Sequence, residues 1–206
     1  MIGLIDFGGG NQASVEGALS HLNVEFRRVR TAEDIDRLDA LVFPGVGAAA
    51  PAMACLRAGG IDRALIEFIR SGRPYLGICL GLQLLFEHSS EDGTTCLGVL
   101  EGEVVRVPTQ EKLPHVGWNT VHFTGPAALL GEADGSHFYF THSYAAQPKD
   151  SRLVWGTTDY GGTLVSAVAE PPLYAVQFHP ERSGDVGLRL LAAFSSLSSD
   201  GPPLAG

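Results

Sequence analysis

The sequence has no long hydrophobic run and few cysteines. No stretch approaches the roughly 20 consecutive apolar residues of a membrane-spanning helix, which argues against a membrane protein. The three cysteines, Cys55, Cys79 and Cys96, include no Cys-x-x-Cys pair, which argues against a disulfide framework or zinc ribbon and favours a reducing compartment. Because a strand pattern begins at Ile2, no signal peptide is expected. We therefore expect a cytoplasmic protein.

Positive charge is also scarce. Lys and Arg total 14 against 23 Asp and Glu, and the net charge of −9 at pH 7 argues against a nucleic-acid partner. The seven histidines show no His-x-x-x-His spacing, and no Gly-x-x-x-x-Gly-Lys loop is present, so neither a metal nor a cofactor is predicted. A length of 206 residues with a hydrophobic fraction of 45% suits one globular domain.

Strand and helix patterns alternate in the first half of the chain. They predict strands at residues 3–7, 25–29, 40–43 and 75–78, and helices at about 12–22, 48–58 and 61–70. Asn11 is a candidate N-cap of the first helix, and Thr31 with Asp34 is a candidate cap of a short helix. Such alternation indicates a parallel sheet covered by helices on both faces, whose ligands bind at the carboxyl ends of the strands.

The second half of the chain has a different pattern. Strands separated by turn residues are predicted at 101–107, 120–123, 138–143, 153–158, 164–169 and 173–178, followed by a helix at 185–197. Residues 198–206 are rich in Ser, Gly and Pro and are predicted to form a flexible tail. We therefore predict a single α/β domain over residues 1–197, with a mostly parallel central sheet flanked by helices and added antiparallel strands in the second half.

Cys79 stands between two glycines at the junction of a predicted buried strand and a predicted buried helix at 80–86. This arrangement is typical of a nucleophile elbow. The helix N-terminus would direct free N–H groups and a positive dipole end at the sulfur, and both favour the thiolate. On its own, a cysteine in an apolar stretch is more often a small buried hydrophobe.

A second motif, Gln-Phe-His-Pro-Glu, follows the last predicted strand. A cysteine nucleophile needs a base, and the base needs a group that orients it. His179 can be the base, and Glu181 can hold its far ring nitrogen, fix the tautomer and stabilise the imidazolium. The two motifs together predict a catalytic triad of Cys79, His179 and Glu181.

The paired motifs resemble the triad, or class I, glutamine amidotransferases. Over about residues 2–195, the chain is most similar to the glutaminase subunits of imidazole glycerol phosphate synthase, through the segments 6–11, 44–47, 79–83, 114–119 and 142–144. The resemblance implies a flavodoxin-like fold and hydrolysis of glutamine to glutamate and ammonia through a Cys79 thioester. The chain departs from that family at Phe7 and Gln12, where Tyr and Leu are usual.

Attack on the glutamine amide creates an oxyanion that needs backbone N–H donors. Leu80 N–H can be one donor and the peptide at Val46 or Gly47 the other, although Pro44–Gly47 can also be a simple strand-ending turn. Gln83 lies on the same helix face as Cys79, where its amide must pair either with substrate or with backbone. The resemblance implies a glutamine site formed by Gly45, Gln83, Glu91, His142, Ser143 and Tyr144, with Glu91 binding the α-amino group and residues 142–144 bordering the α-carboxylate.

The chain shows no recognisable site for an acceptor of ammonia, which points to a partner protein. The resemblance implies a heterodimer with a (β/α)₈ cyclase subunit in histidine biosynthesis, contacted by Asn11, His115, Trp118 and Asn119. Trp118 can alternatively be a core residue. Two other functions stay open: the glutaminase of another amidotransferase, such as that of anthranilate or pyridoxal phosphate synthesis, or a catalytically inactive binding module on the same fold.

Overall fold

The structure is a computed structural model and describes residues 1–124, 129 and 133–198. A parallel sheet lies at its centre, with strands in the order β2, β1, β3, β4 and β13. These strands are β1 (Ile2–Ile5), β2 (Phe26–Val29), β3 (Ala40–Phe43), β4 (Tyr75–Ile78) and β13 (Leu173–Val176). Apart from the edge strand β2, they are buried along their whole length, as expected for parallel strands covered on both faces. The predicted parallel sheet is confirmed.

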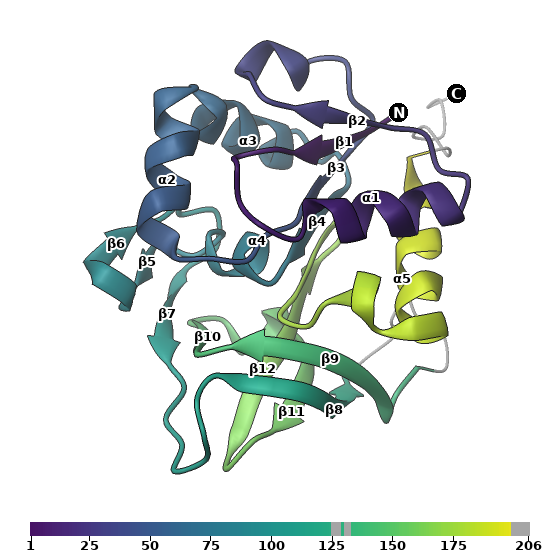
Figure 1. The fold of residues 1–206 in the computed structure, drawn as a ribbon. Helices are drawn as coiled ribbons and strands as arrows, with labels where there is room; N and C mark the ends of the chain where they lie inside the picture. The colour runs from purple at the N-terminus through teal and green to yellow at the C-terminus, as the bar shows by residue number, and fades with distance from the viewer. Residues whose placement is uncertain (125–128, 130–132, 199–206) are drawn as a thin grey trace.

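Helices cover both faces of this sheet (Figure 1). The long helices are α1 (Gln12–His21), α2 (Ala49–Ala58), α3 (Ile61–Arg70) and α5 (Gly184–Leu197). Successive strand residues point to opposite faces, so Ile5 packs in the hydrophobic cluster of α2 and α3, and Leu4 packs in the cluster of α1 and α5. The sheet is therefore packed between two hydrophobic cores, which fix the positions of its strand ends. In the described part of the chain, no helix is long and apolar enough to cross a bilayer.

The sheet continues beyond β13 through mostly antiparallel strands, in the order β12, β10, β7, β5 and β6, while β11, β8 and β9 form a side branch. Their bounds are β5 (His88–Ser89), β6 (Thr94–Thr95), β7 (Gly102–Arg106), β8 (His115–Phe123), β9 (Ser136–His142), β10 (Tyr144–Pro148), β11 (Val154–Asp159) and β12 (Thr163–Glu170). The added antiparallel strands are confirmed. The sequence did not predict β5, β6 or β10, and β8 begins five residues earlier than expected.

The helix after Cys79 is shorter than predicted. α4 spans only Leu80–Gln83, whereas the apolar pattern predicted a helix over residues 80–86. It ends because the carbonyls of the next turn are taken by another segment: Leu84 and Phe86 accept from the N–H groups of Leu97 and Gly98. The remaining helices are short 3₁₀ turns at Ala32–Asp34, Glu91–Gly93, Ser151–Leu153 and Pro180–Arg182. Apart from Ser198, the predicted tail lies outside the described residues.

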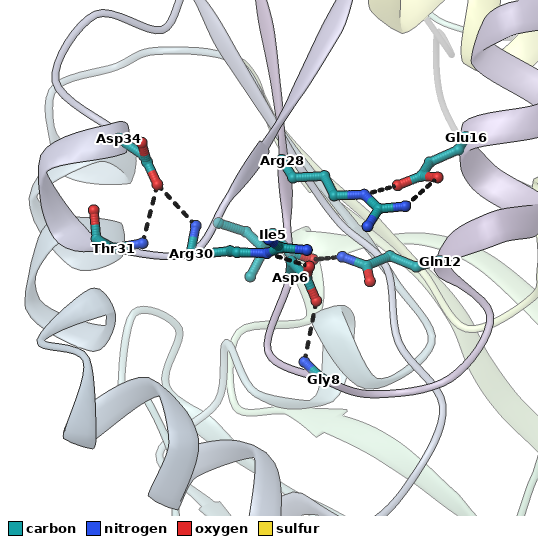
Figure 2. A network of polar contacts seen from close by, with 9 residues as sticks. All are labelled: Ile5, Asp6, Gly8, Gln12, Glu16, Arg28, Arg30, Thr31 and Asp34. Atoms are coloured by element: carbon teal, nitrogen blue, oxygen red, sulfur yellow. Dashed lines mark hydrogen bonds and ion pairs between the residues drawn. The ribbon is translucent and has the colours of Figure 1, made fainter.

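A polar network holds the loop between β1 and α1 (Figure 2). Asp6 accepts from Arg30 Nε at 2.8 Å and from the N–H of Gly8 at 3.3 Å. Burial alone would raise the pKa of Asp6, but these bonds and the Arg30 charge lower it. Gln12 Nε2 donates to the Ile5 carbonyl at 2.9 Å and so ties the start of α1 to the end of β1. The unusual Gln12 therefore fastens the loop that carries Phe7 and Asn11.

Candidate active site

Cys79 lies in a sharp turn between β4 and α4. Its φ of 53° is positive, which is strained for a residue other than glycine, and its side chain is buried. The two neighbouring glycines are needed for close packing. A Cβ atom on Gly81 would lie 2.0 Å from the Phe43 carbonyl oxygen, and one on Gly77 would lie 2.6 Å from the Gly81 carbonyl oxygen. The turn has the geometry of a nucleophile elbow.

The second motif reaches Cys79 because β13 runs parallel to β4. Val176 is the register partner of Ile78, and the N–H of Cys79 donates to the Val176 carbonyl at 2.7 Å. His179 lies three residues beyond Val176, and its Nδ1 is 2.8 Å from Glu181 Oε1, with both side chains fully buried. The Nε2 atom of His179 has no hydrogen-bond partner among the described residues. The structure thus pairs the predicted base with its orienting carboxylate and leaves the other ring nitrogen available.

The charges around His179 favour its protonated form. Burial lowers the pKa of His179, but the Cys79 thiolate and the Glu181 carboxylate outweigh this effect and raise the pKa to about 10. The imidazole therefore holds a proton at neutral pH. A protonated histidine beside a cysteine in general favours the thiolate, which is the nucleophilic form of that side chain.

Gln177 is a site residue that sequence reasoning missed. Its Nε2 donates to Cys79 Sγ at 3.4 Å, and its Oε1 accepts from Gln83 Nε2 at 3.1 Å. Gln83 Nε2 also donates to the Tyr144 carbonyl at 3.1 Å, so its amide pairs with protein groups, one of the two possibilities that the sequence left open. The sequence carried one signal that could have identified Gln177 as a site residue: it is a polar residue directly after the apolar run of β13.

A cleft of about 430 Å³ opens beside the cysteine. Its lining includes eight predicted site residues: Val46, Gly47, Cys79, Gln83, Glu91, His142, Ser143 and Tyr144. Pro114, Thr141 and Arg182 also line the cleft and were not predicted as site residues. Glu91 is held there because its Oε2 accepts from the N–H of Ala49 at 2.9 Å, at the start of α2. The cleft is thus lined by both an acidic side chain and a thiol, around a space suited to a small polar molecule.

The predicted oxyanion hole is not open in this structure. The N–H of Leu80, the expected first donor, instead donates to the Gly45 carbonyl at 3.2 Å. In a planar trans peptide the C=O and N–H point in opposite directions, so the N–H of Val46 faces away from Leu80. Two contacts hold this arrangement: Val46 forms a β-bridge with Gly10, and the Phe7 ring lies against Gly45.

The residues assigned to a partner interface have different environments. Asn11 occupies the predicted N-cap position of α1, but its side chain makes no capping hydrogen bond. Its Nδ2 instead donates to Glu181 Oε1 and lies 3.2 Å from His179 Nδ1. Trp118 is 57% exposed, which excludes the core alternative, and Val116 beside it is 56% exposed.

The fold and the site described above are typical of one class of enzymes, and comparisons with known protein families and solved structures identify the same class. Residues 3–194 match the family Glutamine amidotransferase class-I. A solved structure described as a glutamine amidotransferase has a TM-score of 0.78 at 24% identity, covering 97% of this chain and 99% of that one, and this shows the shared fold. The chain belongs to the class I glutamine amidotransferases.

Full-length relatives narrow the assignment. The imidazole glycerol phosphate synthase subunit HisH of Dehalococcoides mccartyi is 44% identical over 200 residues, which cover 96% of this chain and 98% of that protein. The chloroplastic imidazole glycerol phosphate synthase hisHF of Arabidopsis thaliana is 44% identical over 199 residues, which cover 94% of this chain and 34% of the plant protein. Within the class, the chain belongs to the HisH family of imidazole glycerol phosphate synthase glutaminase subunits.

Proposed function

We propose that the chain hydrolyses glutamine at Cys79 and passes the ammonia to a cyclase subunit, HisF, in a cytoplasmic heterodimer that serves histidine biosynthesis. The observation that carries the catalytic part is the convergence of the two motifs. The strained Cys79 follows β4, and the buried His179 follows the adjacent parallel strand β13. The Nδ1 atom of His179 lies 2.8 Å from the Glu181 carboxylate. A merely structural cysteine would need none of these features.

The chemistry is acyl transfer through a covalent intermediate. The Cys79 thiolate attacks the side-chain amide carbon of glutamine, and a sulfur–carbon bond forms. As the carbon–nitrogen bond breaks, the protonated Nε2 of His179 gives its proton to the leaving nitrogen, and ammonia departs. His179 then takes a proton from water, whose oxygen attacks the thioester and releases glutamate. As the sulfur–carbon bond breaks, Cys79 leaves as the thiolate while His179 keeps the proton taken from water, which restores the starting pair. Glu181 keeps the ring oriented throughout.

The closed oxyanion hole supports regulation by the partner. A half-turn of the peptide between Gly45 and Val46 would remove the Gly45 carbonyl from Leu80 and bring the N–H of Val46 into its place. Both N–H groups would then face the oxyanion, and one such donor is typically worth about 3 kcal/mol in the transition state. A bound partner can favour the turned state only by binding it more tightly than the resting state.

A protein partner also fits the fate of the product. Free ammonia becomes ammonium in neutral water and loses its nucleophilicity, so direct transfer preserves its use. The exposed pair Val116 and Trp118 on β8 offers an apolar contact surface. The HisH relatives favour the cyclase over the anthranilate or pyridoxal phosphate systems, and the intact triad favours an enzyme over an inactive module.

The test is to combine the chain with a HisF cyclase, its ribonucleotide substrate and glutamine labelled with ¹⁵N at the amide. We expect glutamate release to rise by orders of magnitude with the loaded cyclase, and the label to enter the imidazole ring. Unlabelled ammonium added to the buffer serves as the control, because a direct transfer is not diluted by it. Full dilution of the label, or no response to the cyclase, would refute the proposed coupling.

A further inference from the structure

Two buried histidines lie outside the triad and share a hydrogen bond. His115 on β8 and His142 on β9 are direct register partners in the antiparallel ladder. They are 3% and 6% exposed, and His115 Nδ1 lies 3.1 Å from His142 Nε2. The His115 ring is stacked between Phe140, at a centroid distance of 4.8 Å, and Tyr160, at 3.9 Å, so its plane is fixed. Because His115 is buried, it does not offer the partner contact expected from the sequence.

The direction of these hydrogen bonds follows from one backbone group. The Tyr144 carbonyl can only accept, and His142 Nδ1 lies 2.8 Å from it, so His142 must carry its proton on Nδ1. Burial lowers the pKa of His142 to about 4, so the ring is neutral and its Nε2 is an acceptor. His115 must then donate from Nδ1. Its own pKa is lowered by burial, and its Nε2 faces Asn119 Nδ2, a donor, at 3.3 Å.

The same carbonyl connects this pair to the catalytic cysteine. Tyr144 O accepts a second hydrogen bond, from Gln83 Nε2 at 3.1 Å. Gln83 in turn holds Gln177, whose Nε2 donates to Cys79 Sγ at 3.4 Å. Both ring nitrogens of His142 are occupied, so the ring cannot donate to a glutamine carboxylate in this arrangement. His142 lines the cleft, but its ring is engaged in holding the start of β10.

We propose that His115 is a positioning residue for the glutamine site. Its Nδ1–H holds the His142 ring, the ring holds the Tyr144 carbonyl, and that carbonyl sets the Gln83–Gln177 amide pair beside the sulfur. The inference rests on the proposed glutaminase function, because its effect is measured on glutamine binding. It assigns to His115 a role inside the domain, through hydrogen bonding and not through packing alone.

Two substitutions separate hydrogen bonding from packing. His115→Phe keeps an aromatic ring in the stack but has no donor, and His115→Asn loses the ring but places an amide N–H as many bonds from Cα as Nδ1. Measured in the complex with the loaded cyclase, we expect His115→Phe to raise the KM for glutamine at least tenfold with a smaller change in kcat, and His115→Asn to stay within about threefold of wild type. A packing role gives the reverse order, and that order would overturn the proposal.

Tyr160→Leu is the matched packing control, because it removes a stacking partner of His115 and leaves the hydrogen bond; we expect a KM within about threefold of wild type. A second readout does not depend on activity. In the full chain with ¹⁵N-labelled histidine, we expect NMR at pH 7.5 to show both rings in the neutral Nδ1–H tautomer. An Nε2–H form of either ring in an active enzyme would refute the role of His115. A wild-type complex without glutaminase activity would instead refute the proposed function.

Discussion

Replacement of Val46 by glycine should raise glutamine hydrolysis by the isolated chain. Turning the peptide between Gly45 and Val46 reverses the N–H of Val46 and drives its φ to positive values. A β-branched side chain resists that conformation, and such strain costs about 1–3 kcal/mol, whereas glycine accepts it freely. If this strain limits the turned state, Val46→Gly should increase partner-free glutamate release by about 5- to 150-fold, at one factor of ten per 1.4 kcal/mol.

The control for this experiment is Val46→Ala. Alanine loses the contact between the Val46 side chain and Gly10, just as glycine does, but it retains the Cβ atom that opposes positive φ. Glutamate release should therefore stay near the wild-type rate in Val46→Ala, and alkylation of Cys79 by iodoacetamide should be equal in all three proteins. An equal rise in both variants would assign the effect to the lost contact. No rise in Val46→Gly would refute the reasoning.

Three other predictions test the triad and the partner surface. Cys79→Ala should abolish glutamate release with the fold intact by circular dichroism, while Cys55→Ser stays active; activity in the first variant would remove Cys79 from its role. Glu181→Gln should cost less turnover than His179→Ala, and should move the alkaline limb of the kcat/KM profile to lower pH, because Glu181 helps to raise the pKa of His179. An unshifted limb would contradict this account. Trp118→Ala should lower the stimulation by cyclase more than the unstimulated rate. It should change the free energy of unfolding by no more than about 0.5 kcal/mol, because the Trp118 side chain is exposed. Equal losses in the stimulated and unstimulated rates would show that Trp118 does not act through the partner.

The sequence predicted those parts of the fold that depend on local pattern. Apart from the edge strand β2, the parallel strands are short apolar runs, and the helices between them show their own spacing, so both could be recognised in a single chain. β10 could not, because Ala145 and Ala146 have no strong preference for a strand, and pairing with β7 creates it. The length of α4 depended similarly on Leu97 and Gly98, whose N–H groups bond the carbonyls of the turn that follows α4.

The site residues can likewise be divided into those that a local motif predicts and those whose role depends on tertiary structure. Cys79, His179 and Glu181 belong to short motifs whose spacing carries their chemistry, so the sequence could single them out. The role of Gln177 depends on the register between β13 and β4, which no local pattern shows. The occupied N–H of Leu80 depends on the orientation of one peptide in another loop, and that choice between two backbone states is set by tertiary contacts.

The position of β13 also governs when the site can exist. It is the last strand along the chain, but it lies between β4 and β12 within the sheet. During synthesis, a nascent chain that ends before residue 173 therefore carries the cysteine without its base, and leaves an unpaired edge on β4 that can recruit other strands. Insertion of β13 closes that edge and delivers the histidine in one step. An incomplete chain therefore lacks the base needed to hydrolyse glutamine, and any catalytic activity reports that β13 has paired with β4.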